Sequence, residues 1–205
     1  HRGQEAAGIV SCDGRLFHSQ RGLGHVSDNF GSQAVIDALP GDSAIGHVRY
    51  ATSGKKTIMR NVQPIFAELS FGGVAIAHNG NLTNAKTLRR DLVRRGCIFQ
   101  SEMDTEVITH LMATSRQADV VDRLIDALTA IDGAYALLML TEGKLVGARD
   151  PYGVRPLVLG TLDGAPILAS ETCALDILGA TFIRDIEPGE IVIITREGIR
   201  SLKPF

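Results

Sequence analysis

Residues 134–140, with the sequence AYALLML, carry an apolar side chain at every position. Successive side chains of a β-strand point to opposite faces of its sheet, so both faces of this strand must be covered. Residues 43–51 and 73–78 are further apolar runs of strand length. Covering both faces requires a second sheet on one side and helices on the other. This constraint favours a layered fold.

The order of the predicted elements agrees with such layers. Strands are predicted at residues 6–12, 15–20, 43–51 and 73–78, and again at 134–140, 144–148, 157–160, 167–170 and 190–195. Helices are predicted at 32–39, 83–95 (with Thr83 as N-cap and Gly96 as C-terminal stop), 104–114 and 120–131. Short turns such as Asp13-Gly14 and Asp163-Gly164 indicate hairpins and antiparallel pairing. We therefore predict an α+β fold, a four-layer α/β/β/α sandwich of two mainly antiparallel sheets, as one domain over residues 1–205.

Composition excludes several classes of function. The net charge of −2 over 205 residues is not that of a nucleic-acid-binding protein. No apolar run approaches the roughly 18 residues of a membrane span. The three cysteines are far apart and odd in number, which fits a reducing cytoplasm better than a disulfide framework. The chain starts at His1, without a signal peptide or an initiating Met, and we expect it to be a piece of a longer protein.

Arg49 lies near the end of the apolar strand predicted over 43–51, in the string GHVRYATSG. A buried guanidinium needs a partner, because an unpaired buried charge is very costly. One interpretation is an internal ion pair. The other is a bidentate grip on a ligand carboxylate, which suits the planar guanidinium better than a lysine. Thr52 would add a hydroxyl group nearby.

The string HNGN comes after the strand at 73–78. Asn-Gly is a common turn signal, which is the simpler interpretation. At a strand end beside an arginine site, the Asn79 side-chain N–H and the Gly80 backbone N–H also form a pair of donors for one oxygen atom. A donor of this kind contributes about 3–4 kcal/mol to an acyl-transfer transition state.

Asp104 stands at the start of the helix predicted over 104–114. It is interpreted either as an N-cap carboxylate, worth about 1 kcal/mol, or as the counter-charge for a ligand ammonium group. Together with Arg49 and Asn79 it would hold a small zwitterion by both charged ends. His18, His25 and His110 lack the spacing of metal ligands. Gly22-Leu23-Gly24 lacks the pattern of a phosphate loop, and we expect the charges of 149–156 to be structural or interfacial.

Five strings, in order and spacing, resemble one family over essentially the whole chain. They are HRGQEAAGIV at 1–10, GHVRYATSG at 46–54, HNGNLTN at 78–84, DTEVI at 104–108 and RDPYGVRPL at 149–157. They resemble the class II glutamine amidotransferase domain, an N-terminal-nucleophile hydrolase. Within it they are most similar to the branch that passes ammonia to phosphoribosylpyrophosphate in purine synthesis. The resemblance implies that glutamine is hydrolysed to glutamate and ammonia.

The resemblance also implies roles for individual residues. Arg49, helped by Thr52, would bind the α-carboxylate of glutamine, and Asp104 would bind its α-ammonium group. Asn79 and Gly80 would form the oxyanion hole. The remaining roles fall to Arg2 and Gly3, which would line the neighbourhood of the nucleophile, and to Tyr50, which would couple the glutaminase site to the acceptor site.

Two parts of the family pattern are missing from the sequence. The family opens its mature chain with a nucleophilic cysteine, for which His1 and Cys12 are no substitute. The acceptor domain, a C-terminal phosphoribosyltransferase domain, is also absent. The resemblance implies that this domain would carry magnesium with phosphoribosylpyrophosphate, and it leaves open an iron–sulfur cluster there. We therefore expect these residues alone to bind glutamine weakly without hydrolysing it, to hold no metal or cofactor, and to act within a homo-oligomer.

Two alternatives stay open. One is the same glutaminase domain attached to another acceptor enzyme, such as a hexosamine-phosphate synthase. That branch, however, differs at the opening motif and carries tryptophan where this chain has Tyr50. The other is a non-catalytic relative that kept the fold and lost the nucleophile, which the sequence upstream of His1 would test.

Overall fold

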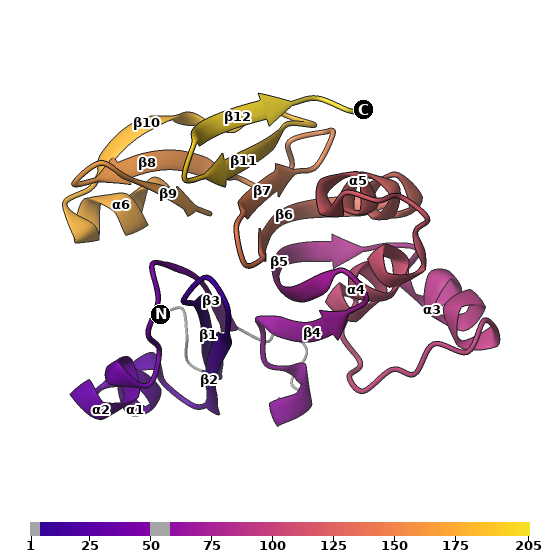
Figure 1. Cartoon of the computed structure of the whole chain (residues 1–205), viewed down its shortest axis with the longest axis horizontal. Coiled ribbons are helices and arrows are strands. Elements are labelled where there is room, and N and C mark those ends of the chain that lie inside the picture. Colours follow the sequence, from indigo (N-terminus) through magenta and orange to yellow (C-terminus); the bar gives the residue numbers. More distant parts are fainter. Residues whose placement is uncertain (1–4, 50–57) are drawn as a thin grey trace.

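The structure is a computed structural model that describes residues 5–49 and 58–205. Its largest sheet has the strand order β12-β11-β7-β6-β5-β4, and all neighbouring strands are antiparallel. The strands are β4 (Ile65–Leu69), β5 (Gly72–Leu82), β6 (Gly133–Leu140), β7 (Leu145–Arg149), β11 (Ile191–Thr195) and β12 (Gly198–Leu202). The fully apolar strand predicted at 134–140 is β6, and it lies inside this sheet between β5 and β7 (Figure 1).

Three helices cover one face of this sheet (Figure 1). They are α3 (Ala85–Arg94), α4 (Thr105–Thr114) and α5 (Val120–Ala130). Ile108 of α4 and Leu124 of α5 are fully buried against Ile76 of β5 and Leu137 of β6 in the main core cluster. Burial of each such side chain stabilises the fold by about 1.5–3 kcal/mol, so the helical layer is held by packing rather than by helix propensity.

Two three-stranded sheets cover the other face. Their orders are β2-β1-β3 and β10-β8-β9. The strands are β1 (Ala6–Cys12), β2 (Phe17–Leu23), β3 (Ser43–Arg49), β8 (Val158–Leu162), β9 (Ala165–Ala169) and β10 (Thr181–Asp185). Val10 and Ile45 pack with Ala75 of β5, while Leu159 of β8 packs with Val192 of β11. The two cores therefore join a second sheet layer to the large sheet.

The remaining helices complete the fourth layer. The helix α1 (Val26–Phe30) contacts β1 and β2, and α2 (Gln33–Asp37) lies beside α1. The helix α6 (Thr172–Leu178) contacts β8, β9 and β10, and a single 3-10 turn, η1 (Met59–Asn61), precedes β4. The predicted α/β/β/α sandwich is confirmed. In the described ranges, none of the helices has the length and apolar character needed to cross a membrane.

Some local predictions are wrong. The Asp13-Gly14 hairpin has a four-residue loop rather than a two-residue turn, and the Asp13 carboxylate accepts hydrogen bonds from the backbone N–H groups of Arg15 and Leu16. Thr83 does not cap α3; its hydroxyl donates to the carbonyl of Asp132 instead. In both places a hydrogen bond between a side chain and the backbone replaces the predicted structure, the two-residue turn in the first case and the helix cap in the second.

Candidate active site

The predicted site residues that the structure describes lie around one cavity of about 1110 Å³. Arg49 reaches it from the end of β3, Asn79 and Gly80 from β5, and Asp104 from the segment just before α4. These positions, far apart in the sequence, therefore share one pocket. Four other predicted residues, Arg2, Gly3, Tyr50 and Thr52, lie outside the described residues.

Arg49 has no strong acceptor of its own in the cavity. Its Nη1 donates to the carbonyl of Asn61 at 3.3 Å and contacts the Met103 thioether at 2.8 Å, while its Nε is buried without a hydrogen-bond partner. Within 5–49 and 58–205, the structure gives Arg49 no ion pair with a carboxylate. This half-buried guanidinium has only a carbonyl and a thioether as partners, so it keeps N–H donors for an anionic ligand.

Asn79 is held by a second arginine. Arg155 Nη2 donates to the Asn79 side-chain carbonyl at 2.6 Å, and both residues line the cavity. Because the carbonyl oxygen is engaged in this way, the side-chain NH₂ group is the part of Asn79 left to bind a ligand. Asn79 therefore offers a ligand in the cavity a hydrogen-bond donor and not an acceptor.

Gly80 occupies a position that other residues do not tolerate. Its φ angle is +149°, and a Cβ atom there would lie 2.0 Å from the carbonyl oxygen of Ala134 and 2.7 Å from His78 Nε2. The turn interpretation of Asn79-Gly80 is wrong, because β5 continues through both residues and pairs with β6 as far as Leu82. Pairing with a buried neighbouring strand outweighs the local turn preference.

The backbone of β5 is fixed beside the site by a buried glutamine. Strand β4 pairs with β5 only as far as Ile76, and beyond it the Gln63 side chain replaces the missing strand. Gln63 Oε1 accepts from the backbone N–H of His78 at 2.7 Å, and Gln63 Nε2 donates to the His78 carbonyl at 3.2 Å. These two bonds satisfy the backbone N–H and carbonyl of His78 at the unpaired edge of β5, immediately before Asn79 and Gly80.

Asp104 does not act as an N-cap, although it precedes the first residue of α4. No side-chain capping bond is formed; instead Oδ2 accepts from the backbone N–H of Leu82 at 3.0 Å, and Oδ1 lies 3.5 Å from His78 Nδ1. Burial raises the pKa of Asp104, but the hydrogen bonds and charge of these neighbours outweigh it, so the pKa lies below its usual value. Asp104 is therefore an anion that faces the cavity at neutral pH.

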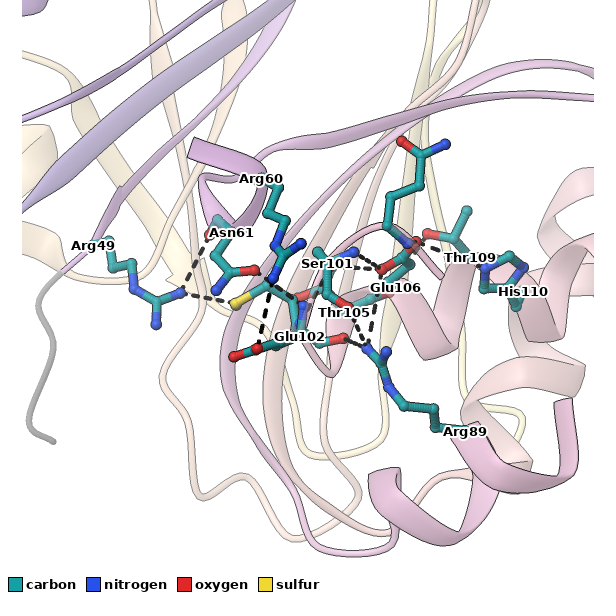
Figure 2. A network of polar contacts seen from close by, with 12 residues as sticks. Arg49, Arg60, Asn61, Arg89, Ser101, Glu102, Thr105, Glu106, Thr109 and His110 are labelled. Carbon is teal, nitrogen blue, oxygen red and sulfur yellow. Dashed lines mark hydrogen bonds and ion pairs between the residues drawn. The ribbon is translucent and has the colours of Figure 1, made fainter. Parts of the chain in front are cut away.

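Figure 2 shows the polar network that supports the segment before Asp104. The buried carboxylate of Glu106 accepts from Gln100 N at 2.7 Å, from Ser101 N at 2.8 Å and from Ser101 Oγ at 2.6 Å. Arg89 Nη2 donates to the carbonyls of Ser101 and Met103 at 2.9 and 3.1 Å. These bonds hold the segment in place against α3 and α4. Glu106 shares the string DTEVI with Asp104, but its role was not predicted.

His47, which lies on β3 two residues before Arg49, also lines the cavity. The pKa of His47 is lowered to about 4, mainly because burial disfavours the charged form, and the nearby His78 and Arg49 contribute to the lowering. His47 is therefore uncharged at neutral pH, and of these two residues of β3 it is Arg49 that carries the positive charge.

The string RDPYGVRPL corrects one expectation. Arg149 donates to the carbonyls of Gly153, Arg155 and Ile186, and the fully buried Asp150 accepts from the backbone N–H groups of Tyr152, Val154 and Arg155. These two charges are structural, as expected. The charge of Arg155 differs from them, because its side chain enters the cavity and binds Asn79. The two residues are separated by 76 positions, so no local pattern indicated the contact.

No cysteine lines the cavity within the described residues. Cys12 is buried in β1, and Cys97 and Cys173 are likewise free thiols that do not line it. Burial raises the pKa of Cys12, which disfavours its thiolate. Nor do the described ranges contain a group of three or more His, Cys, Asp or Glu residues arranged to hold a metal ion.

Comparison with known proteins shows which family the chain is similar to. A family profile described as "Glutamine amidotransferase domain" matches residues 47–176. The chain is 58% identical over 193 residues to the amidophosphoribosyltransferase of Rhizobium etli, a match that covers 94% of this chain and 39% of the relative. The chain therefore spans about two fifths of the length of this relative.

Solved structures show the same likeness. Glutamine phosphoribosylpyrophosphate amidotransferase from B. subtilis, complexed with ADP and GMP, matches with a TM-score of 0.91 and 43% identity, over 98% of this chain and 43% of that chain. A glutamine aminotransferase class-II domain protein from Silicibacter pomeroyi matches with a TM-score of 0.69 and 14% identity, over 97% of this chain and 90% of that chain. The second match shows a shared fold alone.

Proposed function

The chain belongs to the glutamine amidotransferase domain family, and we propose that it is the glutaminase domain of an amidophosphoribosyltransferase. In this proposal it hydrolyses glutamine to glutamate. The ammonia passes to phosphoribosylpyrophosphate on a phosphoribosyltransferase domain, forming phosphoribosylamine for purine synthesis. The observation that supports it most strongly is the single cavity that contains a guanidinium with an unpartnered Nε, a carboxylate and a fixed amide donor.

The charges of the cavity fit the backbone of a free amino acid. The Arg49 guanidinium would bind the α-carboxylate, and the Asp104 carboxylate would bind the α-ammonium group. A ligand that lacked either charge would leave one of these groups unpaired in a partly buried site, at a cost of about 2–5 kcal/mol. The site therefore selects a zwitterion with a side chain that reaches Asn79.

The donors on β5 fit the amide group of that side chain. When a nucleophile attacks the side-chain carbonyl carbon, the carbonyl oxygen gains negative charge. The Asn79 side-chain N–H and the Gly80 backbone N–H would stabilise this oxyanion, because they are already in place and need no reorganisation. Collapse of the tetrahedral intermediate would break the C–N bond and release ammonia, and water would then hydrolyse the acyl-enzyme.

The attacking thiol would enter on a further extended segment. In the described part of the chain, β3 and β9 each form the outer edge of a three-stranded sheet, and both line the cavity, through Gly46 and Leu168. The same two strands line a second cavity of about 200 Å³, through Ile45 and Ile167. Two facing strand edges offer unpaired backbone groups to an inserted strand, which would place a cysteine beside Asn79.

The test is a steady-state assay of the complete protein with glutamine and phosphoribosylpyrophosphate. We expect release of glutamate together with formation of phosphoribosylamine, and formation of phosphoribosylamine from ammonia when glutamine is omitted. If the protein uses ammonia but never glutamine, the glutaminase assignment is wrong. If it releases glutamate but transfers ammonia to a different acceptor, the assignment to an amidophosphoribosyltransferase is wrong.

A further inference from the structure

The contact between Arg155 and Asn79 joins two segments that the fold brings together from opposite parts of the chain. The 2.6 Å distance from Arg155 Nη2 to Asn79 Oδ1 is that of a short, charge-assisted hydrogen bond. Arg155 Nε is buried without a hydrogen-bond partner, and within the described ranges the structure gives Arg155 no ion pair with a carboxylate. The guanidinium is therefore directed to a neutral amide.

The direction of the Asn79 amide decides what the site does. One end of a side-chain amide is an acceptor and the other a double donor, and the two ends have almost the same shape. If the amide turned by 180°, it would present lone pairs to a developing oxyanion and repel it. A cation bound to the carbonyl oxygen favours the productive orientation alone.

The main chain of Arg155 is fixed independently of its side chain. Asp150 Oδ2 accepts from the Arg155 backbone N–H at 3.0 Å, and Arg149 Nε donates to the Arg155 carbonyl at 2.8 Å. The loop thus presents the guanidinium from a rigid support. Replacing the side chain should leave the loop intact, because these anchoring bonds involve only backbone atoms of Arg155.

We propose that Arg155 is a positioning residue of the oxyanion hole, which fixes the orientation of the Asn79 amide and strengthens its N–H donor by polarisation. This inference rests on the proposed glutaminase function. Arg155 acts through Asn79, so its contribution belongs to the transition state and not to the binding of glutamine.

The experiment compares Arg155→Met, which keeps the aliphatic stem, with Arg155→Lys, which keeps the charge. In the complete protein, we expect Arg155→Met to lower kcat for glutamine at least about tenfold, while KM for glutamine and the ammonia-dependent rate stay within about twofold. Arg155→Lys should regain part of the loss. Lys86→Gln is the matched control, because it removes a positive charge from the same cavity without a hydrogen bond to Asn79; its kcat should not change.

A double-mutant cycle with Asn79→Ala separates positioning from a general electrostatic effect. If Arg155 acts through Asn79, Arg155→Met should cost less than about threefold in the Asn79→Ala background. An equal loss in both backgrounds, an effect on KM alone, or an unchanged kcat in Arg155→Met overturns the proposal.

A crystal structure of the Arg155→Met protein gives an answer that does not depend on activity. A turned or disordered Asn79 side chain supports the proposal, and an Asn79 amide that keeps its orientation overturns it. If the wild-type protein releases no glutamate, the proposed function fails, and the orientation of Asn79 in this structure still tests the inference by itself. If Arg155→Met does not fold, Arg155→Lys is used for the structure and the cycle.

Discussion

The carboxylate of Asp104 lies 3.5 Å from the imidazole of His78, and this contact joins the start of α4 to β5. His78 immediately precedes Asn79, and the Gln63 side chain binds both the backbone N–H and the backbone carbonyl of His78. The Asp104 carboxylate and the Asn79 amide are therefore both held in position by the buried His78 backbone and side chain. Their separation is set by the packing of the core and does not depend on a flexible loop.

Asp104→Asn removes the negative charge and keeps the shape of the side chain. We expect kcat/KM for glutamine to fall by the factor that corresponds to a loss of about 2–5 kcal/mol of transition-state stabilisation, because the α-ammonium group of the substrate loses its counter-charge. Ammonia-dependent synthesis should persist, since it bypasses this site. Steady-state assays with glutamine and with ammonia check these two expectations. A parallel loss of the two activities would point to a folding defect.

Arg49→Lys keeps the charge and removes the planar pair of donors. A bidentate grip on the α-carboxylate predicts a rise in KM for glutamine of at least about tenfold. Arg60→Lys is the matched control, because Arg60 is exposed and its ion pair with Glu102 spans 3.8 Å at the surface. If both variants give the same KM as the wild type, Arg49 does not bind the carboxylate.

Gly80→Ala tests the strained position on β5. A methyl group would lie 2.0 Å from the Ala134 carbonyl, so β5 and β6 would have to separate or the backbone would have to leave its φ of +149°. We expect a cost of at least about 2 kcal/mol in the free energy of unfolding and loss of glutaminase activity. Gly143→Ala is the control, because a Cβ atom there meets nothing within 4 Å. A fully active, equally stable Gly80→Ala protein would contradict this geometry.

His47 predicts a pH dependence of stability. Its pKa falls from 6.5 to about 4 on folding, so between these values the unfolded state takes up a proton that the folded state resists. The free energy of unfolding should therefore decrease as the pH falls from 6.5 to 4, by about 3 kcal/mol from this residue. Urea unfolding of His47→Gln should show a shallower decrease than the wild type. Burial also lowers the pKa of His110, but His110 is present in both proteins, so its contribution cancels in the difference. Equal slopes would contradict the prediction.

The layers of the fold could be predicted because they depend on patterns that lie within single segments. The apolar strand at 134–140 required cover on both faces, and β6 has it. The orientation of Asn79 could not be predicted, because it depends on Arg155, 76 positions away. The local Asn-Gly signal indicated a turn, but strand pairing with β6 overrode it. The supporting roles of Gln63 and Glu106 likewise come from bonds to distant backbone groups, which leave no periodic signal in the sequence.

A crystal structure of the complete protein with glutamate bound is the most direct test of the account. Glutamate keeps both α-substituents of the substrate and does not react further. We predict its α-carboxylate within about 3 Å of the Arg49 guanidinium, its α-ammonium group at a similar distance from Asp104, and a side-chain oxygen beside Asn79 and Gly80. A ligand bound outside this cavity, or with its α-carboxylate away from Arg49, would contradict the central claim.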